Sequence, residues 1–179
     1  MPPDYSHWPA LQRAGEAAYR MAGVGPDDVD LAEVHDCFAI AEILAYEELG
    51  FCPKGEGGRF VEKGLSDYGG EVVVNPRGGL IGCGHPLGAT GVAQACEAFW
   101  QLREEAGARQ VPEARVALTH NNSGMGEHVV MIYGRAPACR RSDAGSSRSG
   151  GARPRRKAGA AVAGNPRWLT SLPSGSRSR

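Results

Sequence analysis

The sequence predicts an α/β domain in which helices are layered on a mixed sheet, and two observations lead to this prediction. Stretches with helical periodicity alternate with short apolar or β-branched stretches over residues 1–135, and two strand-like stretches follow one another at the end. Such alternation places parallel strands in one sheet, while a closing pair of strands adds a β-hairpin. We therefore expect a mixed sheet of five strands or a similar number.

The first part of the chain alternates helix, strand and helix. Residues 11–21 have alanines and a methionine spaced on one face and stop at a Gly-Val-Gly-Pro sequence, so we expect a helix there. Residues 29–34 are a short strand candidate that runs directly into His35-Asp36-Cys37, and residues 39–49 are expected to be helical. The residues at 35–37 should therefore lie at the carboxyl end of a strand.

The second part contains a long loop, a strand, a glycine-rich turn, a helix and a hairpin. Residues 52–70 are rich in glycine and show no period, so we expect a loop, and residues 71–74 are a short β-branched strand. Residues 90–105 are a predicted helix, with these apolar residues spaced for burial: Val92, Ala95, Cys96, Phe99, Trp100 and Leu102. Residues 115–119 and 128–133 should pair as a hairpin with a wide loop.

The formal net charge of zero conceals two halves of opposite charge. Residues 1–135 carry 10 basic and 19 acidic side chains, whereas residues 136–179 carry 10 basic and 1 acidic. The second segment is rich in Ser, Gly, Arg and Pro and has few apolar groups, so we expect a folded domain over 1–135 and a disordered basic tail over 136–179. Nucleic acid is not an expected partner, because a solvated tail or a translated non-native reading frame explains the arginines more simply.

Export, membrane insertion and disulfide chemistry are not predicted. No apolar stretch is long enough to span a bilayer, and the N-terminus lacks an export signal, so we expect a cytoplasmic protein. The five cysteines include no C-x-x-C pair, which argues against a disulfide framework and a zinc site. We expect free thiols, with Cys96 in the core.

The glycine-rich stretch over residues 75–91, Asn-Pro-Arg-Gly-Gly-Leu-Ile-Gly-Cys-Gly-His-Pro-Leu-Gly-Ala-Thr-Gly, contains a single histidine. Glycine permits close backbone approach, and Pro86 rigidifies the turn after His85, so the stretch could aim the imidazole at a ligand. His85 could then donate a hydrogen bond from Nε2 to an oxygen that gains negative charge. The alternative is a histidine that only caps a neighbouring strand.

Cys37 is a candidate acid, base or nucleophile. It immediately precedes a predicted helix, and a helix N-terminus favours a thiolate. The alternative is a small buried apolar residue at a strand–helix junction. His35, His120 and Asn121 carry a similar ambiguity, because asparagine in hairpin loops commonly serves turn geometry.

Two ligand-binding interpretations of the glycine stretch are weaker. Residues 82–88 resemble a dinucleotide-binding turn in outline, but the glycine spacing is off by one and Pro86 lacks an N–H donor. Zinc ligation by His35, Cys37, Cys83 and His85 would match no common spacing, so no metal is expected.

Three blocks together resemble the C-terminal half of thiolases, with the sterol-carrier-protein type as the nearest. They are His35-Asp36-Cys37-Phe38, the stretch from Asn75 to Gly91, and His120-Asn121-x-x-Gly124-x-Gly126, and the resemblance covers residues 10–135. It implies an acyltransferase that acts on acyl-CoA by Claisen condensation or thiolytic cleavage. It also implies that Cys37 exchanges the α-proton, that His85 forms part of the oxyanion hole, and that His35 stands where other thiolases place an asparagine.

The resemblance also implies what the site would bind. Coenzyme A thioester would be a substrate, with no tightly bound cofactor, and Gly84, Gly88, Ala89 and Thr90 would lie on the coenzyme A side. The rest of the pocket would include these residues: His120, Asn121 and Gly124. The last turn lacks the cysteine of most thiolases, which leaves Cys37 as its substitute.

The nucleophilic cysteine and most of the coenzyme A loop of thiolases belong to an N-terminal half that this chain does not include. We therefore expect an incomplete enzyme that associates with a thiolase N-terminal half, a second subunit or itself. Two alternatives remain. One is a thiolase-like retro-aldolase subunit, which would not need a thiol at Cys37, and the other is a catalytically silent binding or dimerisation module.

Overall fold

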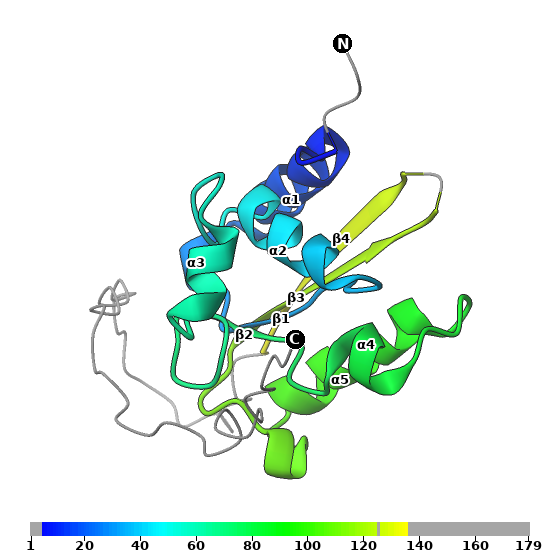
Figure 1. Ribbon diagram of the computed structural model, residues 1–179. Helices are drawn as coiled ribbons and strands as arrows, with labels where there is room; N and C mark the ends of the chain where they lie inside the picture. Colours follow the sequence, from blue (N-terminus) through cyan, green and yellow to red (C-terminus); the bar gives the residue numbers. More distant parts are fainter. Residues whose placement is uncertain (1–4, 125, 136–179) are drawn as a thin grey trace, which may run out of the picture. The chain divides into compact units, whose positions relative to one another are not determined.

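The computed structural model describes residues 5–124 and 126–135, in which helices cover both faces of one mixed sheet (Figure 1). The predicted α/β fold with a terminal hairpin is confirmed. The basic tail predicted over residues 136–179 lies outside the described residues.

The sheet has the strand order β2-β1-β3-β4. Its strands are β1 (Leu31–Glu33), β2 (Val73–Val74), β3 (Val116–Asn122) and β4 (His128–Gly134). β1 is parallel to both β2 and β3, while β4 is antiparallel to β3. The described part therefore has a sheet of four strands, which agrees with the expectation of five strands or a similar number.

One face of the sheet is covered by α1 (Pro9–Ala22), α2 (Ala39–Glu48) and α3 (Gly57–Glu62) (Figure 1). The predicted helix at 11–21 is present, but it buries Leu11, Gly15 and Tyr19, whereas Met21 is exposed. The helix α3 lies within the stretch expected to be a loop. It is too short to show a period and begins with two glycines, and Phe60 anchors it in the core.

The other face carries α4 (Gly79–Cys83) and α5 (Thr90–Leu102) (Figure 1). The helix α4 was not expected, because its five residues lie inside the glycine-rich stretch. Two short 3₁₀ turns complete the elements, Pro26–Asp28 and Gly107–Arg109.

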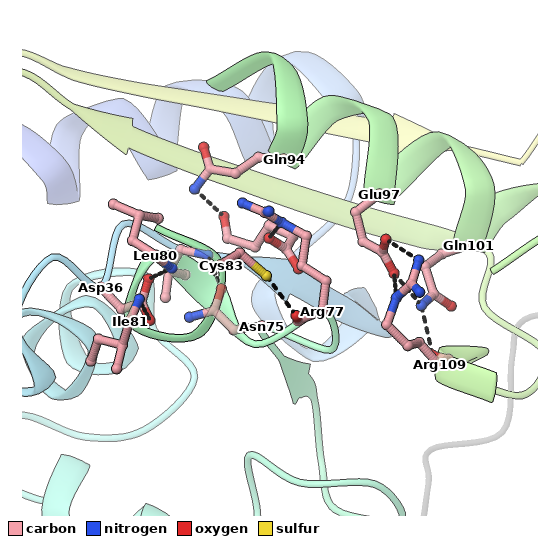
Figure 2. A network of polar contacts seen from close by, with 12 residues as sticks. Asp36, Asn75, Arg77, Leu80, Ile81, Cys83, Gln94, Glu97, Gln101 and Arg109 are labelled. Carbon is pink, nitrogen blue, oxygen red and sulfur yellow. Dashed lines mark hydrogen bonds and ion pairs between the residues drawn. The ribbon is translucent and has the colours of Figure 1, made fainter. Parts of the chain in front are cut away.

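The burial of α5 is largely the reverse of the expected one, because Leu102 is the only one of its six apolar residues expected in the core that is buried. Its buried face carries Gln94, Glu97 and Gln101, while the apolar residues Phe99 and Trp100 are exposed. Buried polar groups are tolerated where they are hydrogen-bonded, and these side chains bond to the chain around them. Gln94 donates to the His120 carbonyl at 2.9 Å. Gln101 donates to the Arg109 carbonyl at 2.7 Å, and the Glu97 carboxylate pairs with Arg109 (Figure 2).

The same inversion corrects the expectation for Cys96, which is exposed instead of buried. Periodicity reports where apolar residues gather on a helix, but it does not report which neighbour will cover them. In the described residues no helix or strand packs over Phe99, which stays 57% exposed beneath the Arg103 side chain.

Side chains of successive strand residues point to opposite faces and build two cores. Ala32 and Leu118 pack toward α1 and α2, whereas Leu31 and Ala117 pack toward α5. Because β1, β2 and β3 are parallel, their carboxyl ends meet at one edge of the sheet. None of the helices in the described residues is long and apolar enough to cross a membrane.

Candidate active site

Two histidines from distant segments meet beyond the carboxyl end of β1. The rings of His35 and His85 lie edge to face, with their centroids 4.8 Å apart. His35 follows β1, and His85 lies in the turn between α4 and α5. The turn therefore brings an exposed imidazole against a buried one.

His35 is buried, and its ring is held by the terminal hairpin. Its Nδ1 lies 2.5 Å from Oδ1 of Asn121, 86 residues further along the chain. The same oxygen accepts the backbone N–H of Asn122 at 3.1 Å, so Nδ1 of His35 is the donor. Burial lowers the pKa of His35 below its ordinary value, and the neighbouring His85 lowers it further. The neutral ring therefore keeps an unprotonated Nε2.

Asn121 also lies against the first turn of α5. A Cβ built on Gly91 would be 2.9 Å from Nδ2 of Asn121, so only glycine leaves that amide undisturbed. The His-Asp-Cys segment, the glycine-rich stretch and the hairpin thus meet around His35, Asn121 and Gly91.

His85 is oriented by Thr90, the buried first residue of α5. Its Nδ1 lies 2.8 Å from the Thr90 hydroxyl, which donates to the Pro86 carbonyl at 3.0 Å, so Nδ1 is the donor to the Thr90 oxygen in this arrangement. Nε2 of His85 then donates to a ligand oxygen when the ring is protonated, or when the hydroxyl rotates its proton toward Nδ1 and the neutral ring carries its own proton on Nε2. In both tautomers the contact with Thr90 leaves Nε2 for a ligand.

Cys37 is half-buried and immediately precedes Phe38, the N-cap of α2. Two residues of chain span at most about 7 Å, so the Cys37 backbone lies within that distance of His35. Cys37 therefore belongs to the same short segment as His35.

Three side-chain bridges join the segment after β1 to the glycine-rich stretch, and Figure 2 shows residues of all three. Asn75 accepts the Val34 N–H at 2.9 Å, and Arg77 donates to Glu33 at 2.9 Å. The third bridge joins the Asp36 carboxylate to the N–H groups at the start of α4. The sequence interpretation assigned none of these polar residues a role, although an acidic residue in an apolar strand is a signal that a cation must be near.

The remaining site candidates lie further from the histidine pair or show no contact with it. His120 is fully buried, and its ring stacks on His128 with Nε2 3.0 Å from Nδ1 of His128. Burial, with a smaller contribution from His128, lowers the pKa of His120 to about 3. Gly84 ends α4 with φ 85°, Ala89 is the N-cap of α5, and two glycines have open space around them: Gly88 and Gly124.

Metal ligation finds no support in residues 5–124 and 126–135, where no three His, Cys, Asp or Glu side chains are grouped to hold an ion. The described cysteines are free thiols. The contact of the two rings can hold an oxygen atom near two imidazoles, and the chain continues from His35 to Cys37.

Comparison with known proteins places this geometry in a family. The family model described as thiolase C-terminal domain-like matches residues 2–135. Sterol carrier protein 2 of Rattus norvegicus is 56% identical over 122 residues, which are 68% of this chain and 22% of that protein. Acetyl-CoA acetyltransferase of Methanothermobacter thermautotrophicus is 54% identical over 123 residues, which are 69% of this chain and 32% of that protein.

A solved structure shows the same fold. The Ltp2-ChsH2(DUF35) aldolase superposes with a TM-score of 0.68 at 23% identity, over 76% of this chain and 35% of that one. The chain thus spans between about a fifth and a third of the length of these relatives.

Proposed function

The chain belongs to the thiolase C-terminal domain-like family, and from this premise we propose that it serves as the C-terminal domain of a thiolase-type acyltransferase. The observation that carries the proposal is the contact of the His35 and His85 rings, 4.8 Å apart, at the carboxyl edge of the sheet. Two imidazoles at that place suit the oxygen of a thioester, and Cys37 lies in the same segment as His35. The substrate is an acyl-CoA.

The first step is removal of a proton from the carbon next to the thioester carbonyl. The Cys37 thiolate takes the proton, and the electrons of the C–H bond move to the carbonyl oxygen, which forms an enolate. His85 donates from Nε2 to this oxygen, and unprotonated Nε2 of His35 can hold a water that donates to it as well. Proton removal and charge stabilisation must coincide, since neither alone makes the enolate accessible.

In the condensation direction, the enolate carbon attacks an acyl group held as a thioester on a cysteine that another domain supplies. A carbon–carbon bond forms, and that cysteine leaves as a thiolate. In the cleavage direction, the thiolate of that cysteine attacks the β-carbonyl carbon and the same carbon–carbon bond breaks. Cys37 then returns the proton to the enolate carbon, and free CoA takes the acyl group from the cysteine. Gly84, Gly88 and Ala89, which lead from α4 into α5, face the coenzyme A portion in this proposal.

A domain exchange tests the proposed function. The 123 residues of the Methanothermobacter acetyl-CoA acetyltransferase that align with this chain are replaced by those of this chain, and the product is called the chimera below. We expect the chimera to exchange the α-protons of acetyl-CoA for deuterium in D₂O and to cleave acetoacetyl-CoA only when free CoA is present. A folded chimera that does neither would contradict the proposal, and cleavage of a β-hydroxyacyl-CoA without consumption of CoA would favour the retro-aldolase alternative.

The partner of the chain is proposed to be a thiolase N-terminal half or a second subunit that packs on the exposed face of α5. This face and the end of β4 form a groove of about 800 Å³ with Phe99, Trp100 and Tyr133 in its lining. Phe99 is 57% exposed and Val92 is 64% exposed, which is unusual for large apolar side chains gathered on one helix.

We expect the 179-residue chain to associate at micromolar concentration, and Phe99→Asp to weaken the association at least tenfold, because the substitution puts a charge in the groove. Analytical ultracentrifugation measures both. Val61→Asp is the matched control, since Val61 is also exposed but lies on α3, which covers the other face of the sheet. A wild-type chain that stays monomeric would refute association with a second copy through this surface, and equal effects of the two substitutions would place the association elsewhere.

A further inference from the structure

Asp36 lies between His35 and Cys37, yet it is only 2% exposed. Its carboxylate accepts the backbone N–H of Leu80 at 2.6 Å and that of Ile81 at 3.4 Å (Figure 2). Both N–H groups lie in the first turn of α4, where they have no partner within the helix. The Asp36 side chain, next to Cys37 in the chain, thus accepts the hydrogen bonds of N–H groups at the start of α4 in the glycine-rich stretch.

The contact leaves no room for a side chain at Gly79. A Cβ built there would be 2.1 Å from Oδ2 of Asp36, and the φ angle of Gly79 is +60°. Gly82 in the same helix has no atom within 4 Å of the corresponding position. Of these two glycines of α4, therefore, the first is required by the carboxylate and the second is not.

The contact has a direct consequence for the histidine pair. The helix α4 ends at Cys83, and after Gly84 the chain continues with His85. On the other side of the contact, His35 and Cys37 are the residues before and after Asp36 in the chain. A shift of α4 relative to Asp36 would therefore change the distance between His85 and both residues of the other segment.

We propose that Asp36 is a positioning residue, which ties α4 to the His35–Cys37 segment and so sets the separation of the Cys37 sulfur and the His85 imidazole. The effect of this positioning on catalysis rests on the proposed function, whereas the hydrogen bonds between Asp36 and α4 do not depend on it.

The other two bridges make the role of Asp36 separable from the stability of the sheet. Asn75 and Arg77 join the same two segments closer to the strands, through Val34 and Glu33. With these bridges in place, loss of the Asp36 contact should release α4 and His85 without opening the sheet.

The test is nuclear Overhauser contact between histidine rings in the full 179-residue chain without substrate. We expect a contact between the rings of His35 and His85 in the wild type, because their centroids are 4.8 Å apart. The contact should be lost in Asp36→Ala and retained in Asp36→Asn, which keeps an acceptor oxygen for Leu80. The His120–His128 pair, with centroids 5.3 Å apart, is the internal control and should be unchanged in all variants.

The glycines of α4 provide a matched pair. Gly79→Ala should abolish the His35–His85 contact, whereas Gly82→Ala should leave it intact. In the Asp36→Ala background, Gly79→Ala should lower the urea midpoint less than it does in the wild type, since the clash is gone. If Gly79→Ala does not fold, the two Asp36 variants still decide the question.

Persistence of the His35–His85 contact in Asp36→Ala would overturn the inference, as would equal behaviour of the two glycine variants. Because no substrate is used, these outcomes do not depend on catalysis. A chimera without deuterium exchange would refute the proposed function and leave the positioning of α4 by Asp36 in place.

Discussion

Replacement of Cys37 by alanine in the chimera should slow deuterium exchange at the α-carbon of acetyl-CoA about a thousandfold, within the range found for loss of a general base. His85→Ala should have an effect of similar size, because the enolate oxygen would lose its direct hydrogen-bond donor. Neither substitution should change the dissociation constant of acetyl-CoA by more than about threefold, since both residues act on the reacting atoms. Mass spectrometry of acetyl-CoA recovered from D₂O measures the rates.

The chain offers a matched control for each substitution. Cys96→Ala removes an exposed thiol of α5, and His7→Ala removes a histidine that contacts Glu48 at 2.9 Å. Both should leave the exchange rate unchanged. Unchanged exchange in Cys37→Ala would instead remove this residue from the reaction, and the same outcome in His85→Ala would remove the histidine.

Replacement of Arg77 by alanine should destabilise the fold by about 3 kcal/mol at pH 8, because it leaves a buried carboxylate without its cation. Glu33 is fully buried, and its Oε2 is 2.9 Å from Nε of Arg77. Burial is the main cause that raises the pKa of Glu33 to about 7, and Arg77 holds it below the value that burial alone would produce. Urea unfolding at fixed pH measures the loss.

The effect of Arg77→Ala should depend on pH. The pKa of Glu33 is about 7 in the folded chain and 4.5 in the unfolded chain, so the folded chain holds more protons between these pH values. The contribution of Glu33 to the free energy of unfolding therefore falls as the pH rises from 4.5 to about 7. Without Arg77 the pKa of Glu33 in the folded chain rises further, so the free energy of unfolding continues to fall at higher pH. At pH 5 Glu33 is protonated in both proteins, and only a neutral hydrogen bond of about 1 kcal/mol is lost.

Two comparisons isolate the charge. In the Glu33→Gln background, the cost of Arg77→Ala should no longer vary with pH. Arg59→Ala breaks an exposed pair with Glu56, whose arginine is 70% exposed, and it should cost less than about 0.5 kcal/mol. A small, pH-independent effect of Arg77→Ala would show that the carboxylate does not need this partner.

The sheet and its long helices could be predicted because local periodicity marks them. The helices at 11–21 and 39–49 and the strands of the hairpin are present within a few residues of their expected bounds. Helices α3 and α4 escaped prediction, since one short turn of helix among glycines has no period to detect. The buried face of α5 was predicted wrongly because its polar residues find partners in distant segments, such as the His120 carbonyl for Gln94.

The sequence motifs singled out the two histidines that the structure brings into contact, but not the polar contacts that hold them. Strand ends and an unusual glycine stretch singled out His35, Cys37 and His85 without any coordinates. The tie between Asp36 and Gly79 could not be seen, because it depends on a close approach of backbone that only the fold creates. The pairing of His35 with Asn121 likewise follows from the parallel register of β1 and β3, which sequence patterns do not specify.

The central claim is that Cys37 and His85 act on one thioester from a shared site. A crystal structure of the chimera with a bound, unreactive acyl-CoA analogue tests it most directly. We predict Sγ of Cys37 within about 4 Å of the α-carbon, and Nε2 of His85 within about 3 Å of the thioester oxygen. An analogue bound with its α-carbon more than about 7 Å from Cys37, or with the two side chains on unrelated surfaces, would contradict the claim.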